Sequence, residues 1–285
     1  MKLQHIAAAV LALTAFGSAN AAIATGGNGS LVLIAYDKNP TGSFATTAGV
    51  FDLGLTMDDL IGSTGNGTAV ANTAAMQGGV KWDLVNNTIT VGTTVTSFGG
   101  TNDWTAAWSR LLANTDANQL SFVVTAFDTV GFGAANRSLI TGKANSTATF
   151  TGTNATGVQA IAGGKNNDIF TPIVNKGTIA SAANGAYTFI AADATPSRVN
   201  GYAMAGDAFG NEWRSNNSLI GETLASDTTS LYIVDGLGKR LELGTLSLSA
   251  ANGTLTLAVP EPTTYALLVT GLAVVGAVAR RRRAA

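Results

Sequence analysis

Residues 240–259 read RLELGTLSLSAANGTLTLAV and carry the clearest fold signal in the chain. Leucine alternates with polar or small residues in both halves, which is the period of a β-strand with one buried face. Asn252 and Gly253 lie between the halves, and this pair favours the type I′ turn of a tight hairpin. The stretch therefore predicts two antiparallel strands, the second of which ends at Val259.

Similar apolar or alternating runs recur upstream of this hairpin. They predict strands at residues 30–37, 50–55, 80–84, 88–96, 120–128, 186–192 and 230–234, with weaker candidates at 145–151, 169–174 and 202–214. Many short strands joined by Gly/Asn turns, without a clean internal repeat, favour a β-sandwich or jelly roll. The sequence thus predicts a mainly β chain with one domain at residues 22–259.

Two short helices are expected within this β framework. Thr56 can cap a single turn in which Asp59 occupies the third helical position, as in a capping box. A longer helix follows residue 103, and its apolar face carries Trp104, Trp108, Leu111 and Leu112. A tryptophan pair can stack on sugars, but this spacing is more typical of a helix face that packs on a sheet.

The charge balance excludes one class of partner. Without Lys2 and the four arginines at the end of the chain, 11 basic residues stand against 17 acidic ones, so residues 22–262 carry a formal charge of −6. An acidic body without basic runs argues against binding to nucleic acid. It suits an exported surface protein.

The residue types that are missing exclude several chemistries. The chain has no cysteine, which removes disulfides and thiolate metal sites. Its one histidine, His5, lies in the segment that we expect to be removed on export. Histidine-based catalysis and histidine-ligated zinc are therefore excluded in the mature protein.

An enzyme built from this chain would have to use carboxylates, a serine/lysine pair or a metal. The body contains Glu212, Glu222 and Glu242, and a glutamate pair can serve as the acid and base of a glycosidase. Their flanking residues match no catalytic signature, so we expect a protein that is not an enzyme. The oxygen-rich loops at residues 166–168 and 207–212 lack calcium-loop spacing, and no metal or cofactor is expected.

Binding of carbohydrate is a second possibility for the body. It would require exposed aromatic side chains along a sheet face or loop rim, and Trp82 and Trp213 are the candidates. Trp213 lies in a polar, turn-rich stretch and is the better one.

The beginning of the chain has the pattern of a secretory signal peptide. Lys2 supplies a positive charge, residues 6–16 are apolar, and Ala19 and Ala21 form a small-x-small cleavage site. We therefore expect residues 1–21 to be removed.

The end of the chain has three distinct parts. Pro260, Glu261 and Pro262 interrupt any preceding strand or helix. Residues 263–279 carry no charge and would form a helix of roughly 25 Å, at the short end of the membrane-spanning range. The cluster Arg280, Arg281, Arg282 and Arg283 would then hold the end on the cytoplasmic side. A buried helix does not need such a cluster, and an ordinary tail anchor does not need Pro-Glu-Pro.

Residues 260–285 resemble the PEP-CTERM sorting signal of Gram-negative bacteria. In that family an exosortase, a membrane-embedded cysteine transpeptidase, recognises the tail. The resemblance implies that Pro260, Glu261 and Pro262 are recognition residues, that residues 263–279 contact membrane lipid, and that the four arginines retain the end. It also implies transient anchoring in the inner membrane, followed by release to the cell surface or medium. Proteins of this type are associated with biofilm and extracellular polysaccharide, so the resemblance implies a structural or adhesive role in the matrix.

Overall fold

The described part of the chain is mainly β, as the sequence predicts. The computed structural model describes residues 29–37, 47–63, 69–71, 76, 78–97, 104–118, 120–127, 137–141, 186–190, 223–225, 227–234 and 240–259. Within these residues, twelve strands form one antiparallel sheet, and β3 (Ile61–Ser63) pairs with β4 (Ala69–Ala71) in a second one. The signal peptide, the expected membrane helix and the strands expected at residues 145–151, 169–174 and 202–214 lie outside the described residues.

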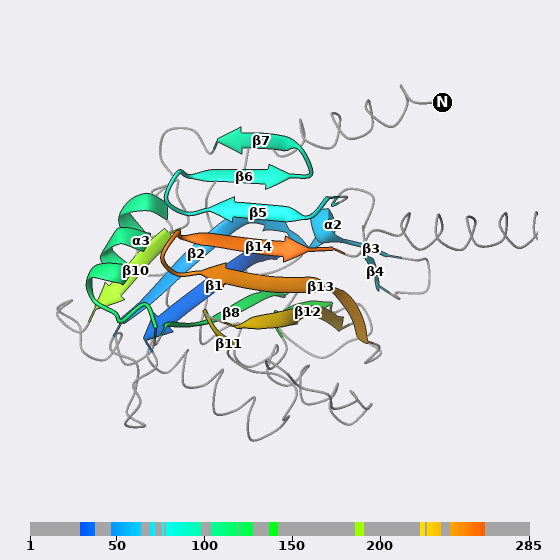
Figure 1. Cartoon of the computed structure of the whole chain (residues 1–285). Helices are drawn as coiled ribbons and strands as arrows, with labels where there is room; N and C mark the ends of the chain where they lie inside the picture. The colour runs from blue at the N-terminus through cyan, green and yellow to red at the C-terminus, as the bar shows by residue number, and fades with distance from the viewer. Residues whose placement is uncertain are drawn as a thin grey trace, which may run out of the picture.

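The large sheet has the order β10-β2-β1-β8-β9-β12-β13-β14-β5-β6-β7, and β11 pairs with β8 (Figure 1). One half contains β10 (Ala186–Ile190), β2 (Thr47–Thr56), β1 (Ser30–Asp37), β8 (Leu120–Phe127), β9 (Ser138–Thr141) and β11 (Thr223–Leu224). The other half contains β12 (Thr228–Val234), β13 (Arg240–Ser249), β14 (Thr254–Ala258), β5 (Val80–Asp83), β6 (Thr88–Val91) and β7 (Thr94–Ser97).

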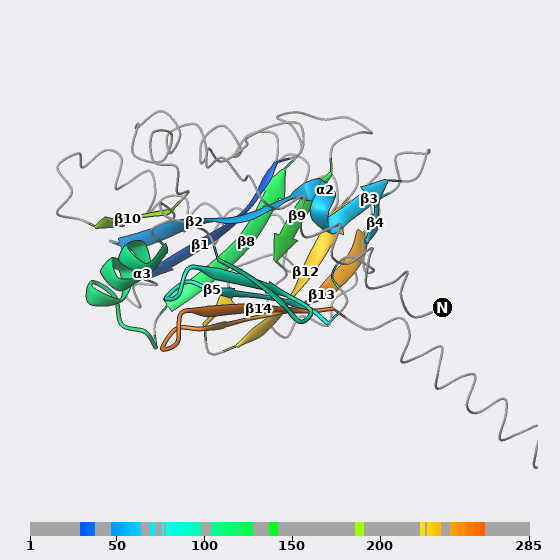
Figure 2. The same ribbon diagram turned by 90° about the horizontal axis from the view of Figure 1, so that it is seen from above.

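This single sheet folds over itself into two layers (Figure 2). In the view from above, β13, β14 and β5 face the layer of β2, β1 and β8. Strands β9 and β12 connect the two layers along the sheet. The ladder stays hydrogen-bonded from β9 through β12 to β13, and the register of β12 and β13 shifts between Leu231 and Tyr232. A bulge of this kind increases the local bend of a strand. The layers are thus one continuous sheet, whereas a β-sandwich or jelly roll has two separate sheets.

The hydrophobic core lies between these layers. Trp82 of β5 is fully buried, and its indole nitrogen Nε1 donates a hydrogen bond of 2.9 Å to the carbonyl oxygen of Leu53 in β2. Leu31, Leu33 and Leu257 belong to the same buried cluster. The tryptophan therefore joins the two layers both by packing and by a polar contact.

Both expected helices are present. The single turn α2 (Met57–Leu60) follows β2, and α3 (Trp104–Ala113) covers one end of the sheet beside β10 and β2. The side chains expected on the apolar face of α3 are buried or packed against the core. Trp104 donates through Nε1 to the carbonyl of Asp52 at 2.9 Å, and Trp108 packs against Phe51 with ring centroids 5.7 Å apart. The tryptophan pair therefore belongs to the core, as its spacing indicates.

One expected turn and one expected strand differ in detail. The β13–β14 connection comprises residues 250–253, and Gly253 (φ 60°) has a left-handed conformation there, while Asn252 does not. The loop is thus a four-residue connection and not the two-residue type I′ turn. The run at residues 88–96 was expected to form one strand, but Gly92 (φ 59°) begins a turn that divides it into β6 and β7.

The two layers differ in how their faces are covered. In β1, β2 and β8 both faces are buried, including Val32, Ile34, Val50 and Val123, which lie outside the core cluster. In β5, β6, β13 and β14 the alternation leaves one face accessible to solvent. This second layer therefore supplies the open sheet face of the described structure.

Candidate functional site at the end of the last strand

The last described strand leads directly into the predicted sorting tail. Strand β14 lies inside the sheet, paired with β13 on one side and β5 on the other. Leu255 and Leu257 point into the core, and Val259 is 9% exposed. The chain therefore leaves the sheet from an internal strand, with no residue between Val259 and Pro260.

Glycines line both sides of this exit. Gly79 (φ 81°) has no room for a side chain, since a Cβ atom there would lie 2.7 Å from the carbonyl oxygen of Leu257. A Cβ atom on Gly244 would collide with the carbonyl oxygen of Ala258. The backbones beside the end of β14 thus approach it closely, as only glycine permits.

A pocket of about 390 Å³ opens beside the exit. Its lining comprises Gly78, Gly79, Val80, Lys81, Thr90, Gly92, Thr256, Leu257, Ala258 and Val259. The glycines contribute backbone only, so Lys81, Thr90 and Thr256 supply the polar side chains of the lining. The pocket can therefore offer an ammonium group and two hydroxyls to a ligand.

The carboxylate of Asp83 lies two residues beyond Lys81. Burial raises the pKa of Asp83, but the Asn86 side chain, the backbone N–H groups of Asn86 and Val85, and the charge of Lys81 outweigh it, so the pKa is lowered on balance. Asp83 is thus held in its ionised form.

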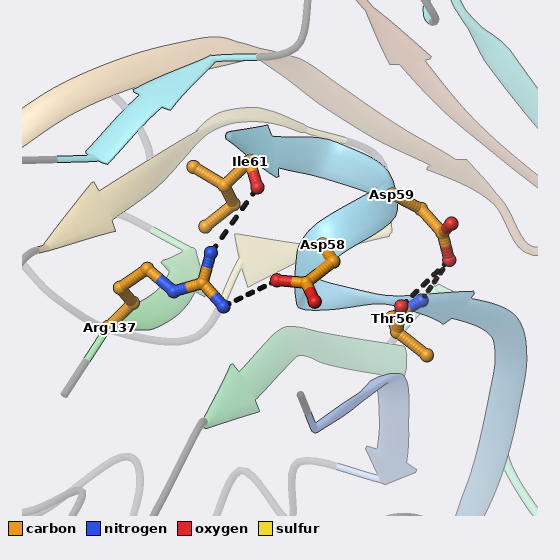
Figure 3. Close-up of polar contacts among 5 residues, drawn as sticks. All are labelled: Thr56, Asp58, Asp59, Ile61 and Arg137. Carbon is orange, nitrogen blue, oxygen red and sulfur yellow. Dashed lines mark hydrogen bonds and ion pairs between the residues drawn. The ribbon is translucent and has the colours of Figure 1, made fainter. Parts of the chain in front are cut away.

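A second polar cluster surrounds α2 (Figure 3). The backbone N–H and the hydroxyl of Thr56 both donate to Oδ2 of Asp59 at 2.8 Å, which confirms the expected cap. Arg137 pairs with Asp58 at 2.7 Å and donates to the carbonyl of Ile61 at 3.3 Å. These contacts hold the start of β9 against the α2 turn. The cluster therefore has a structural role.

Asp52 is a partly buried carboxyl group in β2. Burial raises its pKa to about 6, although hydrogen bonds from the backbone N–H of Gly54 and from the Ser30 side chain oppose the shift. A carboxyl with such a pKa can act in acid–base chemistry, but catalysis by a carboxylate pair requires a second one across a cleft. Among the residues that the structure describes, no three His, Cys, Asp or Glu side chains are grouped to hold a metal ion.

Of the two tryptophans considered for carbohydrate binding, one lies within the described residues. Trp82 is buried in the core and cannot stack on a sugar, so its interpretation as an exposed platform is wrong. Its place in the alternation of β5 explains this, because Val80 and Trp82 point inward and Lys81 points outward. Trp213 lies outside the described residues.

Of the three glutamates, Glu242 is described. It is exposed and accepts a hydrogen bond of 2.7 Å from the Ser230 hydroxyl. Glu212 and Glu222 lie outside the described residues.

The predicted sorting and cleavage residues also lie outside the described part of the chain. They are Ala19, Ala21, Pro260, Glu261, Pro262, Arg280, Arg281, Arg282 and Arg283. None of the helices that the structure describes is long and apolar enough to cross a membrane.

The family comparison identifies the tail that follows β14. Residues 258–283 match the model of the PEP-CTERM protein-sorting motif. The chain carries a PEP-CTERM sorting signal. The PEP-CTERM match begins at Ala258, so it overlaps the end of β14 and the rim of the pocket. It indicates an exported protein that a processing membrane enzyme of the exosortase type recognises. No curated protein and no solved structure matches the chain.

The pocket beside the PEP-CTERM signal does not follow from the sequence. Its lining comes from three separate stretches around Gly79, Gly92 and Thr256, and their proximity depends on strand pairing. The Thr-x-Thr patterns at residues 88–90 and 254–256 supply two polar side chains of the lining, but the same pattern at residues 94–96 does not belong to it.

Proposed function

We propose that the chain is a non-enzymatic surface or matrix protein, sorted to the cell exterior through its PEP-CTERM signal. The observation that carries this proposal is the PEP-CTERM match at residues 258–283, which begins at the last residue of β14. In this reading residues 263–279 hold the chain in the inner membrane, with the arginines inside, until an exosortase processes the tail near Pro260.

The body then has a structural or adhesive role in extracellular matrix or biofilm. A sheet without disulfides is consistent with such a role, because its stability comes from the core and the ladder. Extracellular polysaccharide is the partner that this role implies.

Mass spectrometry of the C-terminal peptide tests the sorting route. The protein is isolated from the outer surface, the medium and the inner membrane of the native host. We expect a terminus between Pro260 and Thr263 in the surface and medium fractions, without the arginines. An intact tail ending at Ala285, found in the inner membrane alone, would contradict processing and leave a membrane-anchored β protein.

A matched pair of variants separates the motif from the membrane segment. Glu261→Ala should leave the tail uncut in the inner membrane, whereas Thr264→Ser in the apolar segment should be processed as the wild type is. Equal processing of the two variants would show that Glu261 is not a recognition residue.

A further inference from the structure

The solvent-facing side of the second layer carries hydroxyl groups in registered rows. Cross-strand pairing places one row across six strands, namely Val95, Thr90, Lys81, Thr256, Ser247 and Thr228. Beside it runs a second row, namely Ser97, Thr88, Asp83, Thr254 and Ser249. We call these eleven residues the hydroxyl face, because eight of them are threonine or serine.

The alternation of the strands confirms that this face points to solvent. The intervening residues Ile89, Trp82 and Leu255 are buried in the core, while each member of the hydroxyl face is exposed or partly exposed. Neighbouring strands lie about 4.8 Å apart, and alternate residues of one strand lie about 6.8 Å apart. The hydroxyl groups therefore form a regular two-dimensional array.

Several of these hydroxyls are available to a ligand. Among the described contacts, the side chains of Thr90, Thr256 and Ser247 make no hydrogen bond to protein. A hydroxyl can donate one hydrogen bond and accept others, so each can meet either type of partner group. The array is thus matched to a molecule that presents both donors and acceptors at short intervals.

The pocket adjoins the first row of this face. Lys81, Thr90 and Thr256 belong both to the row and to the pocket lining. The pocket gives the array a recess in which a ring can be surrounded by polar groups, and concave sites with a few placed polar groups are typical of ligand binding. Lys81 adds donors there, and Asp83 in the second row adds acceptors.

The composition of the hydroxyl face disfavours other classes of partner. A protein interface would need apolar and aromatic anchors, but Val95 is the one large apolar side chain of the face and no aromatic residue belongs to it. Lys81 is its one cation, which is too little for nucleic acid or an anionic membrane surface. An anionic polysaccharide would be repelled by the acidic body, which has a formal charge of −6 at residues 22–262.

We propose that the hydroxyl face binds a neutral polysaccharide, with the pocket at Lys81, Thr90 and Thr256 holding one sugar ring. Binding is by hydrogen bonds to sugar hydroxyls rather than by aromatic stacking. The proposal deepens the matrix role given above and rests on it for the encounter with glycan outside the cell.

Affinity electrophoresis of the full chain tests this proposal. The protein is kept in a non-glycosidic detergent and run through native gels that contain dextran, laminarin or galactomannan, with alginate as the charged comparison. We expect retardation by at least one neutral polysaccharide and none by alginate. The double variant Thr90→Val/Thr256→Val keeps the branched shape and should weaken the association by about tenfold, because each lost hydrogen bond removes a modest increment.

Thr94→Val is the matched control. Thr94 is also an exposed threonine of a β-strand, but its register partner Val91 is buried, so it lies on the opposite side of the ladder. The control should bind like the wild type. Thermal unfolding of both variants near the wild-type temperature shows that the fold is intact.

Several results would overturn the proposal. These are no retardation by any neutral polysaccharide, retardation by alginate alone, and equal binding by the double variant and the control. Inhibition of ice recrystallisation without retardation would reassign the regular array to an ice surface. None of these results depends on tail processing, so failure of the glycan site and failure of the sorting route remain distinguishable.

Discussion

Gly79 shows how strictly a single position near the exit is constrained. Its φ of 81° is unfavourable for any other residue, and the Leu257 carbonyl occupies the space of a side chain. We expect Gly79→Ala to lower the free energy of unfolding by roughly 1–3 kcal/mol, because strain and close approach act together. Urea denaturation measures the loss.

Thr93→Ala, in the exposed β6–β7 turn, is the control for Gly79→Ala. It lies close to the same pocket but places no new atom against the sheet, so its effect should stay within about 0.5 kcal/mol. Equal stability of the two variants would show that the sheet accommodates a methyl group at Gly79 without a loss in the free energy of unfolding.

Asp52 gives the protein a defined pH dependence. Its pKa is about 6 in the folded protein and near 3.8 in the unfolded chain, so the folded state holds the proton more tightly. The free energy of unfolding should therefore fall as pH rises from 4 to above 6, by at most about 3 kcal/mol for this group.

Asp52→Asn should remove this part of the pH dependence. Chemical denaturation at a series of pH values compares the variant with the wild type. If the two proteins lose stability in parallel over this range, Asp52 is not the group responsible.

At the scale of elements, two core tryptophans differ in whether they add a hydrogen bond to their packing. Trp82 donates to the Leu53 carbonyl, whereas Nε1 of Trp108 is buried without a partner. Trp82→Phe would leave that carbonyl unsatisfied and should cost about 1–3 kcal/mol more than Trp108→Phe, which loses no hydrogen bond. Thermal and urea unfolding of the pair measures the difference, and a larger loss in Trp108→Phe would contradict this assignment.

The sequence predicts elements well where alternation or helical spacing is strong. Strands β1, β8 and β14, the α2 turn and the α3 face all follow from local patterns. Strands β3, β4, β9 and β11 were missed, because two to four residues give too short a pattern. The division at Gly92 was also missed, since a threonine-rich run continues the alternation across the turn.

At the scale of the whole molecule, the last strand is part of the fold and not an appendage. Strand β14 fills the space between β13 and β5 and contributes Leu255 and Leu257 to the core. A chain that ends after Val259 should fold as the untruncated protein does. A chain that ends at Gly253 should lose cooperative unfolding, because it lacks an internal strand.

Circular dichroism melts of the two truncations measure this difference. Cooperative melting of the shorter chain would show that β14 is dispensable. The result also bears on processing, since a cut upstream of Val259 would destroy the sheet while a cut at the PEP-CTERM motif would spare it.

The folding-over of the sheet could not be derived from the sequence. Alternation shows which face of a strand is buried, but not which strands cover it. The tail motif could be recognised without the strand order, because Pro260, Glu261 and Pro262 are contiguous in the sequence. The hydroxyl face could not be predicted without the strand order, since two strand pairings place Thr90 and Thr256 on either side of Lys81.

The internal position of β14 has a mechanical consequence. A pull on the chain at Pro260 acts along the axis of a strand that has five paired residues on the β13 side and four on the β5 side. All these pairs share the load in shear, whereas an edge strand pulled along its axis has only one ladder to bear it. A body attached through this end would therefore resist flow and drag better than one attached through an edge of the sheet.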